Sequence, residues 1–124
     1  MQQLLAIAGG GALGAVLRYG MSNGIYRLLG RDFPYGTMAV NILGSLLMGV
    51  LFVLFVERTM VSAEWRLGLL VGFLGAFTTF STFSLETLAL FDAGAPLKAL
   101  LNIMASVVLC LVATWLGMIF GRQI

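Results

Sequence analysis

The sequence from residue 75 to residue 84 reads Gly75-Ala76-Phe77-Thr78-Thr79-Phe80-Ser81-Thr82-Phe83-Ser84. It lies inside a hydrophobic segment of about residues 67–91, where a helix facing lipid would carry Leu, Val, Ile and Ala. Five of its last seven side chains are hydroxyls, and hydrocarbon offers a hydroxyl no hydrogen-bond partner. One or two such groups could bond to carbonyls one turn earlier, but five indicate a broken helix that lines a polar path.

The composition is that of an integral membrane protein. Of the 124 residues, 60% are hydrophobic and 10% are charged, whereas a soluble domain carries about 25% charged residues. Histidine is absent and Cys110 is the only cysteine, which excludes an internal disulfide, a zinc cluster and His-based catalysis. The net charge of +2 is too small for a nucleic-acid-binding surface. We therefore expect neither an enzyme nor a nucleic-acid partner.

Four segments can span a membrane, at residues 4–29, 36–56, 67–91 and 97–120. Each reaches the ~20 residues that a bilayer crossing requires. The short connections carry nearly all the charges, and Pro34 and Pro96 each stand just before a span, where proline fits the first turn of a helix. The sequence thus predicts one all-α, multi-pass domain over residues 1–124 with the lipid bilayer around it.

Polar or small side chains recur at every fourth position of the second and fourth spans, which places each set on one helix face. In the second span these residues are Thr37, Asn41, Ser45 and Gly49. In the fourth span they are Asn102, Ser106, Cys110 and Thr114. Hydrogen bonds between helices are one explanation for such stripes. We favour the other, that both stripes line the path beside the third span.

Two ionisable residues fall inside spans, Arg18 in the first and Glu86 in the third. An ionisable group at membrane depth is a functional candidate by default. For Arg18, a structural role, paired with a carbonyl or with Glu86, is the alternative. The first span also contains Gly10 and Gly14, whose spacing is typical of close helix packing.

The basic residues outside the spans do not favour one orientation in the membrane. The termini and the middle loop share one side and hold Arg58, Arg66 and Arg122, and the other side holds Arg27, Arg31 and Lys98. Because basic residues set the orientation of a membrane protein, this balance predicts insertion both ways. Two oppositely oriented copies could then form an antiparallel homodimer.

The side chains of the expected path suit a small anion. They offer hydroxyl and carboxamide donors together with phenyl rings, whose edges are electropositive relative to their faces. A cation path would need rings of carboxylates or carbonyls, yet Glu86 is the only carboxylate inside a span. The site is therefore expected to bind and pass an anion.

Three motifs resemble those of the CrcB/Fluc fluoride channel family. They are Gly75-x-x-Thr78-Thr79-Phe80-Ser81-Thr82-Phe83-Ser84 in the third span, Gly14-x-x-Leu17-Arg18-Tyr19 in the first, and Asn41-x-x-Gly44-Ser45 in the second. The resemblance covers essentially the whole chain. It implies a dual-topology antiparallel homodimer in the bacterial inner membrane, which exports fluoride passively through two paths and so relieves its toxicity.

The resemblance also implies roles for individual residues. The fluoride pore would be lined by Asn41, Thr79, Phe80, Ser81, Thr82, Phe83, Asn102, Ser106 and Thr114. Arg18 and Glu86 would be vestibule or structural charges. Carbonyls of Gly75 and Thr78 from both copies would hold a structural sodium ion at the dimer centre. Other members often have Tyr and Ser at the positions of Asn102 and Cys110, which leaves the roles of these two residues open.

Two other classes of protein remain as alternatives. A small multidrug-type proton-coupled antiporter also has four spans, but the carboxylate expected in its first span is missing here, and that span holds Arg18 instead. A purely structural membrane subunit explains the small residues but neither the two stripes nor the break.

Overall fold

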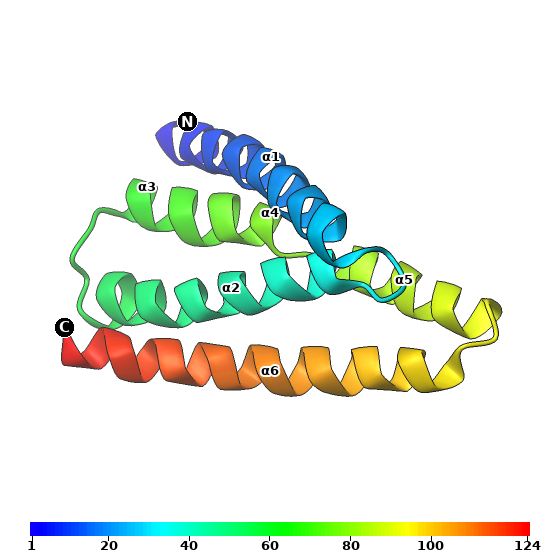
Figure 1. Cartoon of the computed structure of the whole chain (residues 1–124). Helices are drawn as coiled ribbons and strands as arrows, with labels where there is room; N and C mark the ends of the chain where they lie inside the picture. Colours follow the sequence, from blue (N-terminus) through cyan, green and yellow to red (C-terminus); the bar gives the residue numbers. More distant parts are fainter.

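The computed structural model describes residues 1–124 as an all-helical chain (Figure 1). The first and last long helices are α1 (Gln2–Leu29) and α6 (Pro96–Gln123). The second is α2 (Tyr35–Phe52), extended by the π-helical turn η1 (Val53–Glu57). The third consists of α3 (Ala63–Arg66), the π-helical η2 (Leu67–Leu74), α4 (Gly75–Phe77) and α5 (Phe80–Asp92). All four are long and apolar enough to cross a membrane.

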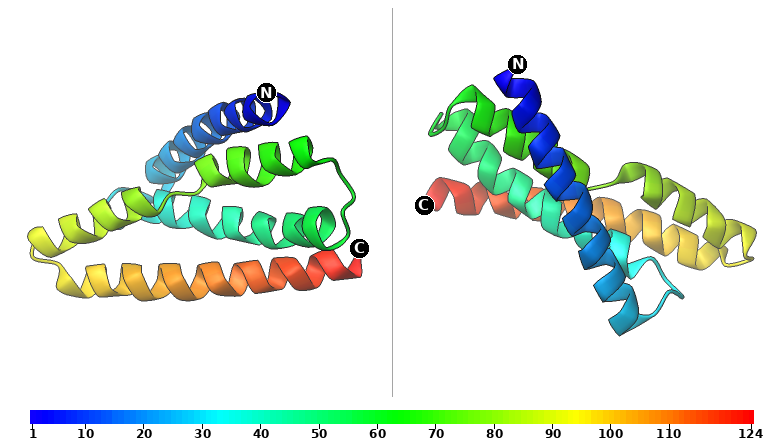
Figure 2. Two further views of the ribbon diagram at one scale, coloured as in Figure 1. Left: turned by 180° about the vertical axis from the view of Figure 1, so that it is seen from behind. Right: turned by 90° about the horizontal axis from the view of Figure 1, so that it is seen from above.

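The third helix is broken at Thr78 and Thr79, as the hydroxyl-rich sequence predicted. Both residues have extended backbones, with φ/ψ of −85°/157° and −151°/118°. The side chain of Thr79 then caps the new helix by accepting a hydrogen bond from the N–H of Thr82 at 3.2 Å. Beyond the break, α5 changes direction and packs along the first half of α6 (Figures 1 and 2).

Glycines allow two pairs of helices to approach closely. A Cβ atom added at Gly10 would clash with the carbonyl of Gly68 in η2, and one added at Gly49 would clash with the carbonyl of Thr114 in α6. The predicted packing role of the first-span glycines is thus confirmed. Gly49 proves to be a packing position between α2 and α6, whereas the sequence placed it in the polar stripe.

Apolar side chains cover most of the outer surface of the chain. Leu13, Val16, Leu88 and Leu111 are all more than half exposed, while only a few residues such as Val40 and Leu74 are fully buried. In water this surface would be costly, but lipid is as apolar as these side chains. The arrangement therefore supports a multi-pass membrane protein.

Candidate functional site

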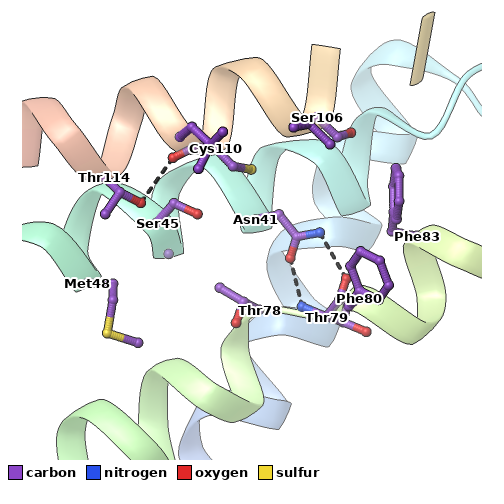
Figure 3. A pocket seen from close by; sticks show the side chains of 13 residues that line it. Asn41, Ser45, Met48, Thr78, Thr79, Phe80, Phe83, Ser106, Cys110 and Thr114 are labelled. Carbon is purple, nitrogen blue, oxygen red and sulfur yellow. Dashed lines mark hydrogen bonds between the residues drawn. The ribbon is translucent and has the colours of Figure 1, made fainter. Parts of the chain in front are cut away.

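Asn41 of α2 bridges the break in the third helix. Its Nδ2 donates to the carbonyl of Thr79 at 2.9 Å, and the N–H of Thr79 donates to its Oδ1 at 2.7 Å (Figure 3). One carboxamide thus satisfies both backbone groups of an extended residue that no helix serves. This pairing uses the oxygen and one N–H of Asn41, and it leaves the second N–H free.

The break also removes helical N–H donors from the carbonyls of residues 75 to 78, including those of Gly75 and Thr78. In a continuous helix, the N–H groups of Thr79 and Thr82 would donate to the carbonyls of Gly75 and Thr78. Here the N–H of Thr79 donates to Asn41, and that of Thr82 donates to Thr79 Oγ1. Gly75 is also exposed, since an added Cβ would meet only the carbonyl of Leu70 at 3.8 Å. The two carbonyls that the resemblance assigned to sodium are therefore among those that lose their helical donors at the break.

A pocket of about 390 Å³ lies between the break, α2 and α6. Its lining contains seven of the residues that the resemblance assigned to a site, together with Ser45 and Cys110 (Figure 3). The seven are Asn41, Thr78, Thr79, Phe80, Phe83, Ser106 and Thr114. No charged residue is part of the lining. The stripes of α2 and α6 therefore meet in one neutral pocket beside the third helix.

Most hydroxyls of this pocket already donate to protein acceptors. Thr78 donates to the carbonyl of Leu74 at 2.9 Å, Thr114 to that of Cys110 at 3.0 Å, and Ser106 to the Oδ1 of Asn102 at 3.2 Å. The side chain of Ser45 makes no hydrogen bond within the chain. The free donors are therefore the hydroxyl of Ser45, the second N–H of Asn41 and the weakly polar thiol of Cys110.

Phe80 and Phe83 form one end of the pocket. Their ring centroids are 5.4 Å apart with the planes inclined by 41°, so edges and faces of both rings are presented to their surroundings. Phe83 is 9% exposed, whereas Phe80 is 77% exposed. A single copy of the chain thus fixes Phe83 but leaves Phe80 uncovered.

Three other hydroxyl residues of the motif, Ser81, Thr82 and Ser84, do not line this pocket. Thr79 Oγ1 donates to Thr82 Oγ1 at 3.1 Å and lies 3.4 Å from Ser81 Oγ, while Ser84 donates to the carbonyl of Phe80 at 2.9 Å. Ser81 is exposed, and Thr82 lines a separate pocket. The structure therefore brings only Thr79 of the predicted trio Thr79, Ser81 and Thr82 to the main pocket.

Asn102 lies outside the pocket as well. It is 1% exposed, and its Nδ2 donates to Thr87 Oγ1 at 2.9 Å while its Oδ1 accepts from Ser106. Thr87 in turn donates to the carbonyl of Phe83 at 2.7 Å. This chain of hydrogen bonds ties α6 to α5 and so supports the backbone that carries Phe83. Sequence reasoning did not identify Thr87, because a threonine inside a helix has no special pattern.

The two intramembrane charges form no ion pair with each other. Glu86 accepts from Thr37 Oγ1 at 2.8 Å and from the hydroxyl of Tyr26 at 3.2 Å. The guanidinium of Arg31 stacks 4.6 Å from the centroid of the Tyr26 ring. Arg18 makes neither a side-chain hydrogen bond nor an ion pair within the chain. The suggested pairing of Arg18 with Glu86 is thus wrong for a single copy, because the carboxylate is already occupied by two hydroxyl donors.

Sequence reasoning did not identify Tyr26 as a site residue, because a tyrosine near the end of a span is typical of the aromatic residues at a membrane interface. The structure shows what allows this role. Gly36, one residue before Thr37, is buried, and an added Cβ would lie 2.5 Å from the Tyr26 ring. A glycine at that position allows the ring to reach Thr37 and Glu86.

The sequence of this chain matches a described protein family. Residues 5–118 match the family model described as "CrcB-like protein, Camphor Resistance (CrcB)". The fluoride-specific ion channel FluC of Methylococcus capsulatus is 59% identical over 121 residues, which cover 98% of this chain and 53% of that protein. The chain thus spans about half the length of that relative.

Two further relatives have nearly the same length as this chain. The protein of the same name from Magnetococcus marinus is 56% identical over 98% of this chain and 99% of its own length. That of Geobacter sulfurreducens is 52% identical over the full length of both. The resemblance seen in the three sequence motifs is confirmed: the chain belongs to the CrcB-like family.

Proposed function

We propose that this chain is a fluoride-selective channel that lets fluoride leave the cytoplasm passively and so reduces its toxicity. The observation that carries the proposal is the neutral pocket beside the helix break, which offers free donors from Asn41 and Ser45 and two phenyl rings but no carboxylate. Relatives at 52–59% identity are named fluoride-specific ion channels. These names describe channels rather than enzymes.

The pocket supplies what a strongly hydrated anion needs. Fluoride gives up water only where other donors replace it, and the free groups of Asn41 and Ser45 are donors. The phenyl edges of Phe80 and Phe83 offer positive electrostatic potential without a full charge, which allows the ion to leave as well as to enter. Ser106 and Thr114, whose protons are directed at protein acceptors, can turn their hydroxyls towards an ion as it passes.

We also infer that two copies of opposite orientation assemble. Three observations support this: the balance of three basic residues on each side, the 77% exposure of Phe80 beside a polar pocket, and the exposed glycine at the break. A second copy would cover Phe80 and complete the wall that one chain leaves open. Each of the two resulting paths would then use residues of both copies. The dimer would lie in the inner membrane of the cell.

The break suits a structural sodium ion at the centre of that dimer. Carbonyl oxygens are ligands that hard cations prefer, and the carbonyls of Gly75 and Thr78 lack the N–H donors that a continuous helix would give them. Two copies would contribute four such oxygens. The bound ion would add a positive charge near the anion paths.

Efflux from liposomes tests the proposed function. Vesicles that contain the purified protein and potassium fluoride should release fluoride when a potassium ionophore is added, and vesicles loaded with potassium chloride should retain chloride. Selectivity follows because chloride is a weaker hydrogen-bond acceptor than fluoride and gains less from the same donors. A fluoride electrode and a chloride electrode measure the two rates, and protein-free vesicles are the control. Equal fluxes of both ions would contradict the proposal.

A further inference from the structure

An apolar groove of about 340 Å³ lies between α1 and the first half of the third helix, which α1 crosses (Figure 2). Its apolar side chains include Leu13 of α1 and Leu69 and Phe73 of η2. Glu64 is the only charged residue of the lining, and it lies beside Trp65 in the first turn of the third helix. The groove therefore has an apolar length and one acidic end.

Gly9 of α1 keeps this groove open. A Cβ atom added at Gly9 would meet nothing within 4 Å, whereas one added at Gly10 would clash with the carbonyl of Gly68. Close packing of the helices therefore accounts for Gly10 but not for Gly9. Because glycine is less stable than alanine inside a helix, the absence of a side chain at Gly9 calls for another reason. An occupant of the groove would supply it.

The groove opens on a side of the third helix that faces away from the proposed dimer axis. Trp65, Leu69 and Phe73 are four residues apart and share one face of that helix. Gly75 lies two residues beyond Phe73, and two residues turn a helix by about half a revolution. Since the second copy is proposed to meet the chain at Gly75, the groove faces the bilayer.

The acidic end of the groove has no cation of its own. The carboxylate of Glu64 forms no ion pair in the chain, either with Arg66 or with the N-terminal ammonium, and Arg66 is not part of the lining. Trp65 is exposed at the start of a membrane-spanning helix, where tryptophan marks the level of the lipid head groups. A fitting ligand therefore combines an apolar chain with a cationic group at head-group level.

We propose that the groove binds a phospholipid whose head group carries a primary ammonium, as in phosphatidylethanolamine. One acyl chain lies along Leu13, Leu69 and Phe73, in the space that Gly9 leaves open, and the ammonium donates hydrogen bonds to the carboxylate of Glu64. A choline head group has no N–H to donate, and Glu64 repels an anionic head group. The bound chain fills the contact between α1 and η2, the segment that leads to the helix break.

Fluorescence quenching by brominated lipids tests this site, because the chain has two tryptophans of similar exposure. Trp65 is 66% exposed, and Trp115, which lies on α6 outside the groove, is 61% exposed. Trp115→Phe and Trp65→Phe each leave one reporter. Each variant is placed in phosphatidylcholine vesicles with a small mole fraction of a lipid with dibrominated chains, whose head group is ethanolamine, choline or glycerol. Because the brominated chains are identical, differences in quenching report the head group alone.

The ethanolamine lipid should quench Trp65 at about a fifth of the mole fraction that the choline lipid requires, the factor expected for one ion pair about 4 Å apart in water. Both lipids should quench Trp115 equally. In the protein that retains Trp65, Glu64→Gln should remove the preference, and so should Gly9→Leu, which fills the groove. Asp92→Asn removes the same charge from the exposed end of α5 and should leave the preference unchanged.

Three results would overturn the lipid site. They are equal quenching of Trp65 by the ethanolamine and choline lipids, a preference that persists in Glu64→Gln, and stronger quenching by the glycerol lipid, whose head group is anionic. If Gly9→Leu does not elute as a single species on size exclusion, Glu64→Gln decides the question. Because the measurement involves no fluoride, failure of the lipid site would leave the proposed channel function intact.

Discussion

Replacing Asn41 with Ala is expected to abolish fluoride efflux and to destabilise the fold. The substitution leaves the N–H and the carbonyl of Thr79 without the partners that now lie at 2.7 and 2.9 Å. Each unsatisfied backbone group costs about 1–3 kcal/mol in a buried site, so the extended conformation at the break is no longer favoured. The free N–H that Asn41 offers to the pocket is lost as well.

Efflux from liposomes and unfolding of the detergent-solubilised protein measure the two effects of Asn41→Ala. Asn23→Ala is a matched control, because the side chain of Asn23 only accepts an exposed, 3.4 Å hydrogen bond from Arg31. The control should keep both the flux and the stability of the wild type. Wild-type efflux from Asn41→Ala would show that the bridge between α2 and Thr79 is dispensable.

The second large effect is expected at the phenylalanine pair. Phe83→Ile and Phe80→Ile each retain an apolar side chain but remove a ring and its electropositive edge. We expect either change to lower fluoride efflux about tenfold, which corresponds to an interaction of ~1.4 kcal/mol, while the protein still assembles. Phe83→Ile should have the larger effect, since its ring is held by the backbone that Thr87 and Asn102 support.

Phe91→Ile provides the control for the phenylalanine pair. Phe91 belongs to the same helix, is 41% exposed and lies outside the pocket. Its replacement should leave efflux unchanged. If Phe80→Ile and Phe83→Ile both conducted fluoride like the wild type, the phenyl rings would have no role in its passage.

The helices and the break could be predicted from the sequence because their causes are local. Length and hydropathy set the four helices, and five hydroxyls in seven residues cannot all be satisfied by one continuous helix in lipid. The third helix begins at Ala63, before its predicted hydrophobic span of residues 67–91, and the sequence Ser62-Ala63-Glu64 indicates this start. A polar first turn explains the difference, because hydropathy marks the apolar part of a helix and not its start.

The use of each side chain could not be predicted, because it depends on neighbours that are distant in sequence. Residues spaced four apart share one face of α6. The first part of that face contacts α5, and the later part borders the pocket. Asn102 is therefore buried against Thr87, while Ser106 and Thr114 reach the pocket. In the same way, periodicity does not distinguish Ser45, whose hydroxyl makes no hydrogen bond within the chain, from Ser106, whose hydroxyl donates to Asn102.

For Asn41, the sequence predicted the position of the side chain but not its hydrogen bonds. Its place in the stripe of α2 predicted a residue of the path, and the structure places it in the pocket wall. The sequence could not show that most of its carboxamide is paired with Thr79, since that depends on how α2 crosses the break.

The position of the path can be tested most directly at Cys110, the only cysteine of the chain and part of the pocket wall. Modification by methyl methanethiosulfonate adds a neutral group at this wall, and mass spectrometry gives the fraction of chains modified. If fluoride passes through this pocket, efflux should fall in proportion to that fraction, and the Cys110→Ser protein should keep its own rate after the same treatment. Full modification of Cys110 with unchanged fluoride efflux would place the path elsewhere.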